Sequence, residues 1–99
     1  MHVALLYFDG CPNWRLADDR LREALVRAGR EDVVVEHRQV ATPEEAEAMQ
    51  FRGSPTLLVD GRDPFLDWDS PVGLSCRVYR IGDRLAGAPT VEQLIAVLR

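Results

Sequence analysis

The most informative stretch of the chain reads Val3-Ala4-Leu5-Leu6-Tyr7-Phe8-Asp9-Gly10-Cys11-Pro12-Asn13-Trp14. Its apolar part, from Val3 to Phe8, is too short for a helix and is bounded by Asp9-Gly10, so it predicts a buried strand. Pro12 is pre-set for the first position of a helix. Cys11 is therefore expected where a strand ends and a helix begins.

That position makes a reactive thiol the favoured interpretation of Cys11. The N–H groups and partial positive charge of a helix N-terminus stabilise a thiolate, and they lower cysteine pKa values from about 8.5 to roughly 3.5 in the strongest cases. The alternative is a small apolar residue that fills space at the strand end. Trp14 stands where a Cys-x-x-Cys motif carries its second cysteine. Oxidised Cys11 must then be resolved by glutathione, by another protein's thiol or by Cys76.

Further elements follow from periodicity and from turn residues. An amphipathic pattern from Pro12 to Gly29 predicts a helix of about four turns, and Val33-Val34-Val35 predicts a strand within residues 32–40. Thr42, Pro43 and Glu45 form a capping box that opens a short helix ending near Gln50.

The second half of the chain begins with the turn Gly53-Ser54-Pro55-Thr56 and a short apolar strand at residues 57–59. A long irregular connection at residues 61–75 precedes a strand at residues 77–81. Thr90 and Gln93 form a second capping box, which opens a closing helix. The expected order is strand, helix, strand, helix, strand, strand, helix, in a single α/β domain over residues 1–99.

Composition narrows the function classes. The chain has 99 residues, of which 46% are hydrophobic, and its 16 acidic residues exceed its 12 basic ones. Neither a nucleic-acid-binding stripe nor a membrane-binding basic helix is expected. No apolar run reaches the roughly 18 residues of a membrane span, and no secretory signal is visible, so we expect a cytoplasmic protein. Two cysteines are too few for a disulfide framework.

The element order, the position of Cys11 and the Ser54-Pro55-Thr56 step before the third strand together resemble the thioredoxin fold. The resemblance covers essentially the whole chain and implies a thioredoxin-like α/β fold with a four-stranded mixed sheet and three helices (βαβαββα). It also implies that Cys11 is the nucleophile and that Pro55 is a cis-proline lying against it. Ser54 would offer backbone hydrogen bonds to an incoming peptide or to glutathione.

Three segments carry a closer resemblance: Phe8–Trp14, Gly53–Thr56 and Gly73–Tyr79. They look like a group of small bacterial thioredoxin-like proteins, some of which are labelled alkylmercury-lyase-related. Trp14 departs from the dithiol pattern of thioredoxin itself, which implies a site with one thiol.

Cys76 has two possible roles. In the thioredoxin topology the fourth strand runs parallel to the first, so Cys76 lies about 20 Å from Cys11, whereas a disulfide needs Cα atoms within about 7 Å. We therefore expect Cys76 to be structural. Alternatively, the long loop carries it back, and Asp9, Cys11 and Cys76 then form two thiolates and a carboxylate suited to soft-metal or carbon–mercury chemistry. Without a nearby histidine this set is not a closed zinc site, and no metal or cofactor is expected.

Neighbouring residues complete the predicted site. Pro12, Trp14, Ser54 and Pro55 are assigned to substrate binding, with Trp14 either capping the helix start or forming a wall of a groove. Arg52 could attract a glutathione carboxylate, although a solvated arginine at a helix end is commoner.

The leading functional prediction is a protein that forms a mixed disulfide between Cys11 and glutathione or a protein thiol. The alternatives are organomercurial or soft-metal chemistry at Cys11 and Cys76, or a peptide- or thiol-binding module without turnover.

Overall fold

A computed structural model describes residues 1–99 and contains three helices and five strands. In chain order they are β1 (Val3–Tyr7), α1 (Asn13–Arg27), β2 (Val35–Gln39), α2 (Pro43–Met49), β3 (Thr56–Val59), β4 (Tyr79–Ile81), β5 (Arg84–Ala86) and α3 (Val91–Leu98).

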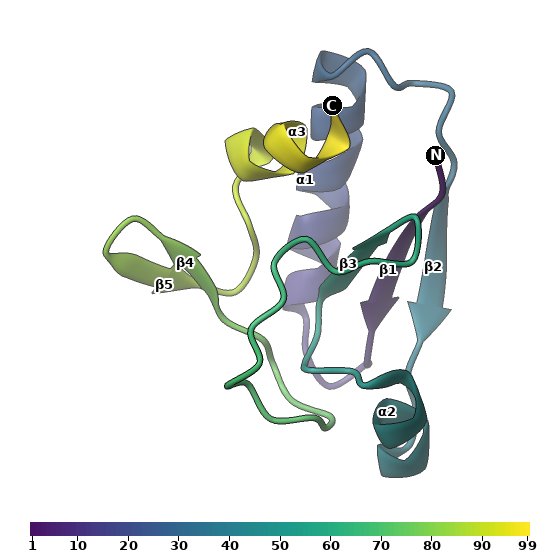
Figure 1. Cartoon of the computed structure of the whole chain (residues 1–99), viewed down its shortest axis with the longest axis vertical. Coiled ribbons are helices and arrows are strands. Elements are labelled where there is room, and N and C mark those ends of the chain that lie inside the picture. Colours follow the sequence, from purple (N-terminus) through teal and green to yellow (C-terminus); the bar gives the residue numbers. More distant parts are fainter.

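The central sheet has three strands in the order β2-β1-β3 (Figure 1). β2 runs parallel to β1 with Val3 aligned to Val35, and β3 runs antiparallel to β1 with Val3 aligned to Val59. β1 is buried along most of its length, as expected for a short apolar strand in the middle of a sheet. The strand predicted from Val3 to Phe8 is thus confirmed, although it ends at Tyr7.

Successive side chains of β1 point to opposite faces of the sheet and contribute to different core clusters. Val3 packs with residues of α1 and α3, and the largest buried cluster lies between these helices and the sheet. Ala4 and Leu6 belong to a second cluster with Val40, Ala46 and Phe51, at the end of the sheet near α2. Figure 1 shows α3 in front of α1 on one side of the sheet, with α2 below the ends of β1 and β2.

The predicted helix starts are confirmed by their caps. Thr42 accepts a hydrogen bond from the Glu45 N–H at 3.1 Å, and Thr90 forms a complete capping box with Gln93. These bonds satisfy N–H groups that have no partner inside the helix.

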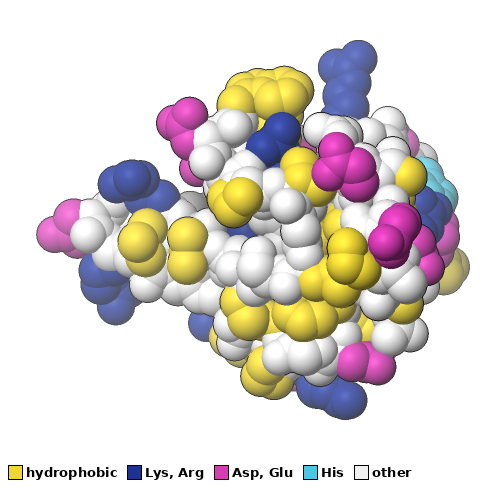
Figure 2. Space-filling model, turned by 90° about the horizontal axis from the view of Figure 1, so that it is seen from below, with side chains coloured by type: hydrophobic (Ala, Val, Ile, Leu, Met, Phe, Trp, Pro, Cys, Tyr) yellow, Lys and Arg dark blue, Asp and Glu magenta, His cyan; other side chains and the backbone are white.

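The predicted four-stranded sheet is wrong. β4 pairs only with β5, in a separate two-stranded hairpin. The outer edge of β3 is engaged by other groups: the Val59 N–H donates to the Arg62 carbonyl, and the Tyr79 hydroxyl donates to the Pro55 carbonyl. Only two isolated bridges extend the sheet on this side, a parallel one between Ser54 and Cys76 and an antiparallel one between Val59 and Arg62. Figure 2 shows the hairpin projecting from the body, with charged side chains around its tip.

The connection between β3 and β4 lies against the body of the protein. Phe65 packs on the cluster between the sheet and the helices, whereas Val72 and Leu74 pack on the cluster near α2. The Gly73 N–H donates to the Phe51 carbonyl at 3.0 Å. This connection brings Cys76 back to the turn after β1.

Candidate thiol–disulfide site

Cys11 lies in the turn between β1 and α1 and is fully buried. Its N–H donates to the Phe8 carbonyl at 3.2 Å, which closes the turn, and Pro12 forms the N-cap of α1. The expected strand-to-helix position is confirmed, but the sulfur is not at an exposed rim. Cys11 Sγ lies 3.6 Å from the Ser54 carbonyl oxygen.

Cys11 and Cys76 form a disulfide, with their Cα atoms 5.7 Å apart. The prediction that Cys76 lies far from Cys11 is therefore wrong. It assumed that Cys76 begins a strand of the central sheet, whereas the long connection places it beside Ser54 before β4 begins. Cys76 is exposed to solvent and Cys11 is not.

Ser54 and Pro55 form the wall behind the disulfide. Their peptide bond is cis, as the resemblance implied, and both residues are buried. The Ser54 N–H donates to the Ser75 carbonyl at 2.7 Å, and the Ser54 carbonyl accepts from the Arg77 N–H at 2.8 Å. The backbone groups that we expected to bind a partner are thus occupied by the residues on either side of Cys76.

Ser54 also carries the one buried side-chain polar atom without a hydrogen-bond partner, its hydroxyl oxygen. A buried hydroxyl without a partner costs free energy, so its presence calls for an explanation. This hydroxyl remains available as a donor in a neighbourhood that contains the Cys11 sulfur.

Of the other predicted site residues, Trp14, Asp9 and Arg52 contact groups other than the two cysteines. Trp14 stacks on Tyr7 with ring centroids 4.2 Å apart, so it covers the end of β1 beside the helix start. Asp9 accepts a hydrogen bond from the Gln39 side chain at 2.9 Å. Arg52 donates to the carbonyls of Ser70 and Trp68, and its guanidinium lies 5.2 Å from the centre of the Trp68 ring. Pro12 is exposed next to the disulfide.

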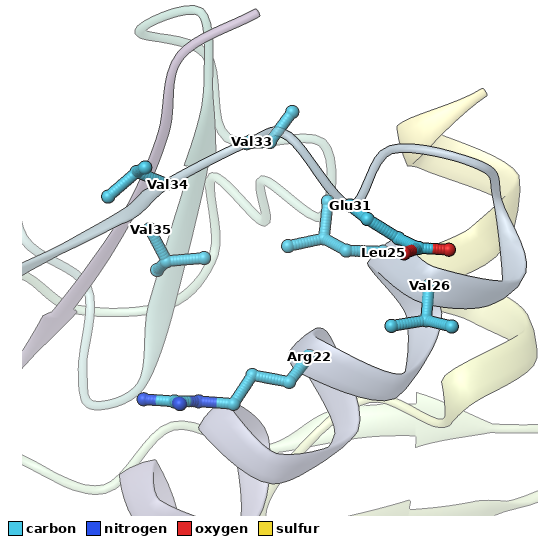
Figure 3. A pocket seen from close by; sticks show the side chains of 7 residues that line it. All are labelled: Arg22, Leu25, Val26, Glu31, Val33, Val34 and Val35. Atoms are coloured by element: carbon cyan, nitrogen blue, oxygen red, sulfur yellow. The ribbon is translucent and has the colours of Figure 1, made fainter.

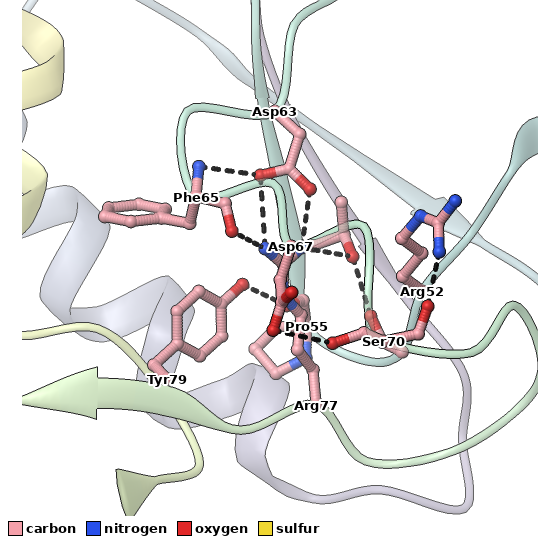
Figure 4. A network of polar contacts seen from close by, with 10 residues as sticks. Arg52, Pro55, Asp63, Phe65, Asp67, Ser70, Arg77 and Tyr79 are labelled. Atoms are coloured by element: carbon pink, nitrogen blue, oxygen red, sulfur yellow. Dashed lines mark hydrogen bonds and ion pairs between the residues drawn. The ribbon is translucent and has the colours of Figure 1, made fainter. Parts of the chain in front are cut away.

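Sequence reasoning missed Arg77, whose side chain is only 3% exposed. Its guanidinium binds both carboxylate oxygens of Asp63, at 2.6 and 3.3 Å, together with Thr56 Oγ1 and the Phe65 carbonyl (Figure 4). These contacts connect the residue after Cys76 to β3 and to the long connection. The sequence signal was a lone arginine directly after a cysteine and before an apolar pattern.

Tyr79 also holds the segment after Cys76 against Pro55. Its hydroxyl donates to the Pro55 carbonyl at 2.5 Å, and its ring packs edge-on against Phe65. Burial raises the pKa of Tyr79 above its ordinary range, which outweighs the opposing charge of Arg77. The phenol therefore remains protonated and able to donate at neutral pH.

Gly53 permits the close approach of the two segments. Its φ is +113°, and a Cβ at this position would lie 2.9 Å from the Arg77 Cβ and 3.1 Å from its Cα. A residue with a side chain would push the Cys76 segment away from Ser54.

No group of three or more histidine, cysteine or acidic residues is arranged to hold a metal ion. Cys11 and Cys76 come together, but Asp9 is bonded to Gln39. The set of two thiolates and a carboxylate is thus only partly assembled.

Comparison with known proteins gives no significant match to a protein-family model, a curated protein or a solved structure. None of the three helices combines the length and the apolar character needed to cross a membrane.

Proposed function

We propose that the protein carries out thiol–disulfide exchange with Cys11 and Cys76 as its redox couple. The observation that carries this proposal is a disulfide that joins a fully buried sulfur-bearing residue to a solvent-exposed one. The partner is glutathione or a protein thiol, as the sequence predicts, but Cys11 has an internal partner in place of the cysteine missing at Trp14.

The solvent exposure of Cys76 determines which of the two sulfurs is attacked first. An incoming thiolate attacks Cys76 Sγ, forms a mixed disulfide with it and displaces Cys11 as a thiolate. A second thiolate then attacks the external sulfur of that mixed disulfide, releasing an oxidised dithiol product and the Cys76 thiolate. Two electrons enter the protein, and two external thiols become one disulfide. The reverse sequence reduces an external disulfide.

The surroundings of Cys11 favour its role as the leaving group. It precedes α1, whose N-terminal N–H groups favour a thiolate. The Ser54 hydroxyl has no partner in the oxidised protein, and we expect it to turn toward that charge once the disulfide is reduced. In the reduced protein, Ser54→Ala should raise the alkylation pKa of Cys11, while Ser75→Ala, at an exposed neighbour of Cys76, serves as the matched control.

The competing interpretation is a disulfide that only stabilises the fold. The reduction potential of the disulfide distinguishes exchange from a purely stabilising role. It is measured by equilibrating the protein in glutathione redox buffers, alkylating the free thiols and determining the oxidised fraction by mass spectrometry. Exchange predicts a reduction potential above about −300 mV, because structural disulfides typically lie below that value. A lower potential, or loss of the far-UV circular dichroism signal on reduction, would contradict the proposal.

Single-cysteine variants test the order of attack. With oxidised glutathione, Cys11→Ser leaves exposed Cys76 and should form a mixed disulfide readily. Cys76→Ser leaves buried Cys11 and should react more slowly at equal pH. The double variant is the blank, and the reverse order of rates would refute the assignment of Cys76 as the site of first attack.

Soft-metal binding remains a second candidate because the two thiols come together. After reduction, Cys11 and Cys76 can supply two thiolates, the ligand type that Hg²⁺ and Cu(I) prefer. Titration of the reduced protein with Hg²⁺ should then give one Hg²⁺ per chain, whereas either serine variant, with a single thiolate, should bind one Hg²⁺ between two chains. Cleavage of a carbon–mercury bond further requires a proton donor, and Asp9→Asn tests whether Asp9 supplies it.

A further inference from the structure

The outer edge of β2 is a free sheet edge. The Val40 N–H donates to the Tyr7 carbonyl, and N–H and C=O groups alternate in direction along a strand. The backbone groups of Val35, His37 and Gln39 therefore point away from β1. No strand pairs with them, and β2 contains no proline. An unpaired edge of this kind is a template for another strand.

We propose that this edge pairs with the same edge of a second copy, antiparallel and centred on His37, to form one six-stranded sheet across a two-fold axis. In this arrangement His37 faces the partner's His37, and Val35 faces the partner's Gln39. All of these residues have outward-pointing backbone groups, so they form the hydrogen-bonded pairs.

The charges on Glu36 and Arg38 favour this register over the neighbouring ones. Between the hydrogen-bonded pairs, Glu36 faces the partner's Arg38, and the two-fold axis repeats the pair with roles exchanged. Side chains come closest at such non-hydrogen-bonded positions, and opposite charges there are favourable. A shift that centres the pairing on residue 36 opposes Glu36 to itself, and a shift to residue 38 opposes Arg38 to itself.

Both charged side chains are available for the contact. Glu36 and Arg38 are each about two-fifths exposed, at 42% and 43%, and already lie side by side on the strand, with N···O at 2.7 Å. Hydrogen bonding from Arg38, followed by smaller effects including that of His2, lowers the pKa of Glu36. Glu36 therefore carries its charge at neutral pH.

Apolar surface continues the edge at the start of β2. Val34 is 84% exposed, and Val33, Val34 and Val35 line an open cavity of about 420 Å³ with α1 (Figure 3). In the register centred on His37, Val33 lies opposite the partner's Ala41, which is exposed. The two-fold axis places this apolar contact at both ends of the paired strands.

The test is the oligomeric state of the oxidised protein by sedimentation equilibrium, with non-reducing gels to exclude intermolecular disulfides. We expect a concentration-dependent dimer. Glu36→Arg and Arg38→Glu each replace two attractive pairs with two repulsive ones and should raise the dissociation constant by about tenfold or more. Glu23→Arg and Arg27→Glu, on the exposed face of α1, are matched controls with the same charge changes.

Mixing the two charge-reversed variants gives the decisive measurement. The Glu36→Arg chain presents two arginines and the Arg38→Glu chain two glutamates, so an equimolar mixture should restore the dimer as a heterodimer. Circular dichroism checks that each variant is folded. The proposal is overturned by a wild type that stays monomeric at high micromolar concentration, by variants that dimerise like the wild type, or by a mixture that fails to associate.

Discussion

Reduction of the disulfide should lower the free energy of unfolding by about 4 kcal/mol. The bond joins residues separated by 65 positions in sequence. In the chain-entropy model a cross-link of this length removes roughly 14–15 cal/mol/K from the unfolded chain, which is about 4 kcal/mol at 25 °C. Breaking the bond returns that entropy to the unfolded state.

Urea denaturation, followed by tryptophan fluorescence and circular dichroism, measures the change with and without reductant. With an m-value of about 1–2 kcal/mol/M, the midpoint should fall by roughly 2–4 M. The m-value itself should rise on reduction, because an unfolded chain without the cross-link exposes more surface. The double variant Cys11→Ser/Cys76→Ser is the control and should behave like the reduced protein.

A decrease in the free energy of unfolding of less than about 1 kcal/mol on reduction would refute this reasoning, since the unfolded chain would not gain the predicted conformational entropy. A reduced protein that does not fold at all would leave the stability argument intact and contradict the proposed exchange cycle. Small domains have about 5–15 kcal/mol of stability, so we expect the reduced form to remain folded.

Three other predictions concern the support of the site. Arg77→Ala should lower the free energy of unfolding by about 3–5 kcal/mol, because it leaves the largely buried Asp63 carboxylate, only 12% exposed, without its partner. Arg77→Met combined with Asp63→Leu should lower it much less in a double-mutant cycle. Tyr79→Phe should cost about 1 kcal/mol at neutral pH through its lost hydrogen bond. Because the pKa of Tyr79 is raised in the folded state, its contribution is present below about pH 10 and is lost above it, so a pH series of unfolding free energies should show less alkaline destabilisation in the variant. Gly53→Ala should destabilise the protein by more than Gly61→Ala in urea titrations, since both have positive φ but only Gly53 is in close contact with other atoms.

Local chemistry made much of the fold predictable. Thr90 forms the complete capping box that its spacing indicates, and the apolar run before Cys11 forms the central strand. At Thr42 only the hydroxyl cap forms, because the Glu45 carboxylate accepts from the Ala41 N–H. Such features depend on residues within a few positions of each other, so the sequence displays them directly.

The partners of distant segments were not predictable in the same way. The pattern from Arg77 to Ile81 indicated a strand but not its neighbour, and β4 pairs with β5, not β3. The disulfide also depends on the path of the long connection, which Asp63 fixes by binding Arg77 14 residues later. No local pattern records a contact of that kind.

The connection at residues 61–75 has a consequence for engineering. Surface loops of this length usually accept inserted residues. Here the loop forms one wall of the protein, and added length would move Cys76 away from Cys11. The turn at Gly82-Asp83, at the tip of the projecting hairpin, holds no such contact. A fluorescent tag or affinity peptide therefore belongs at that tip, while the span from β3 to Cys76 has to keep its length.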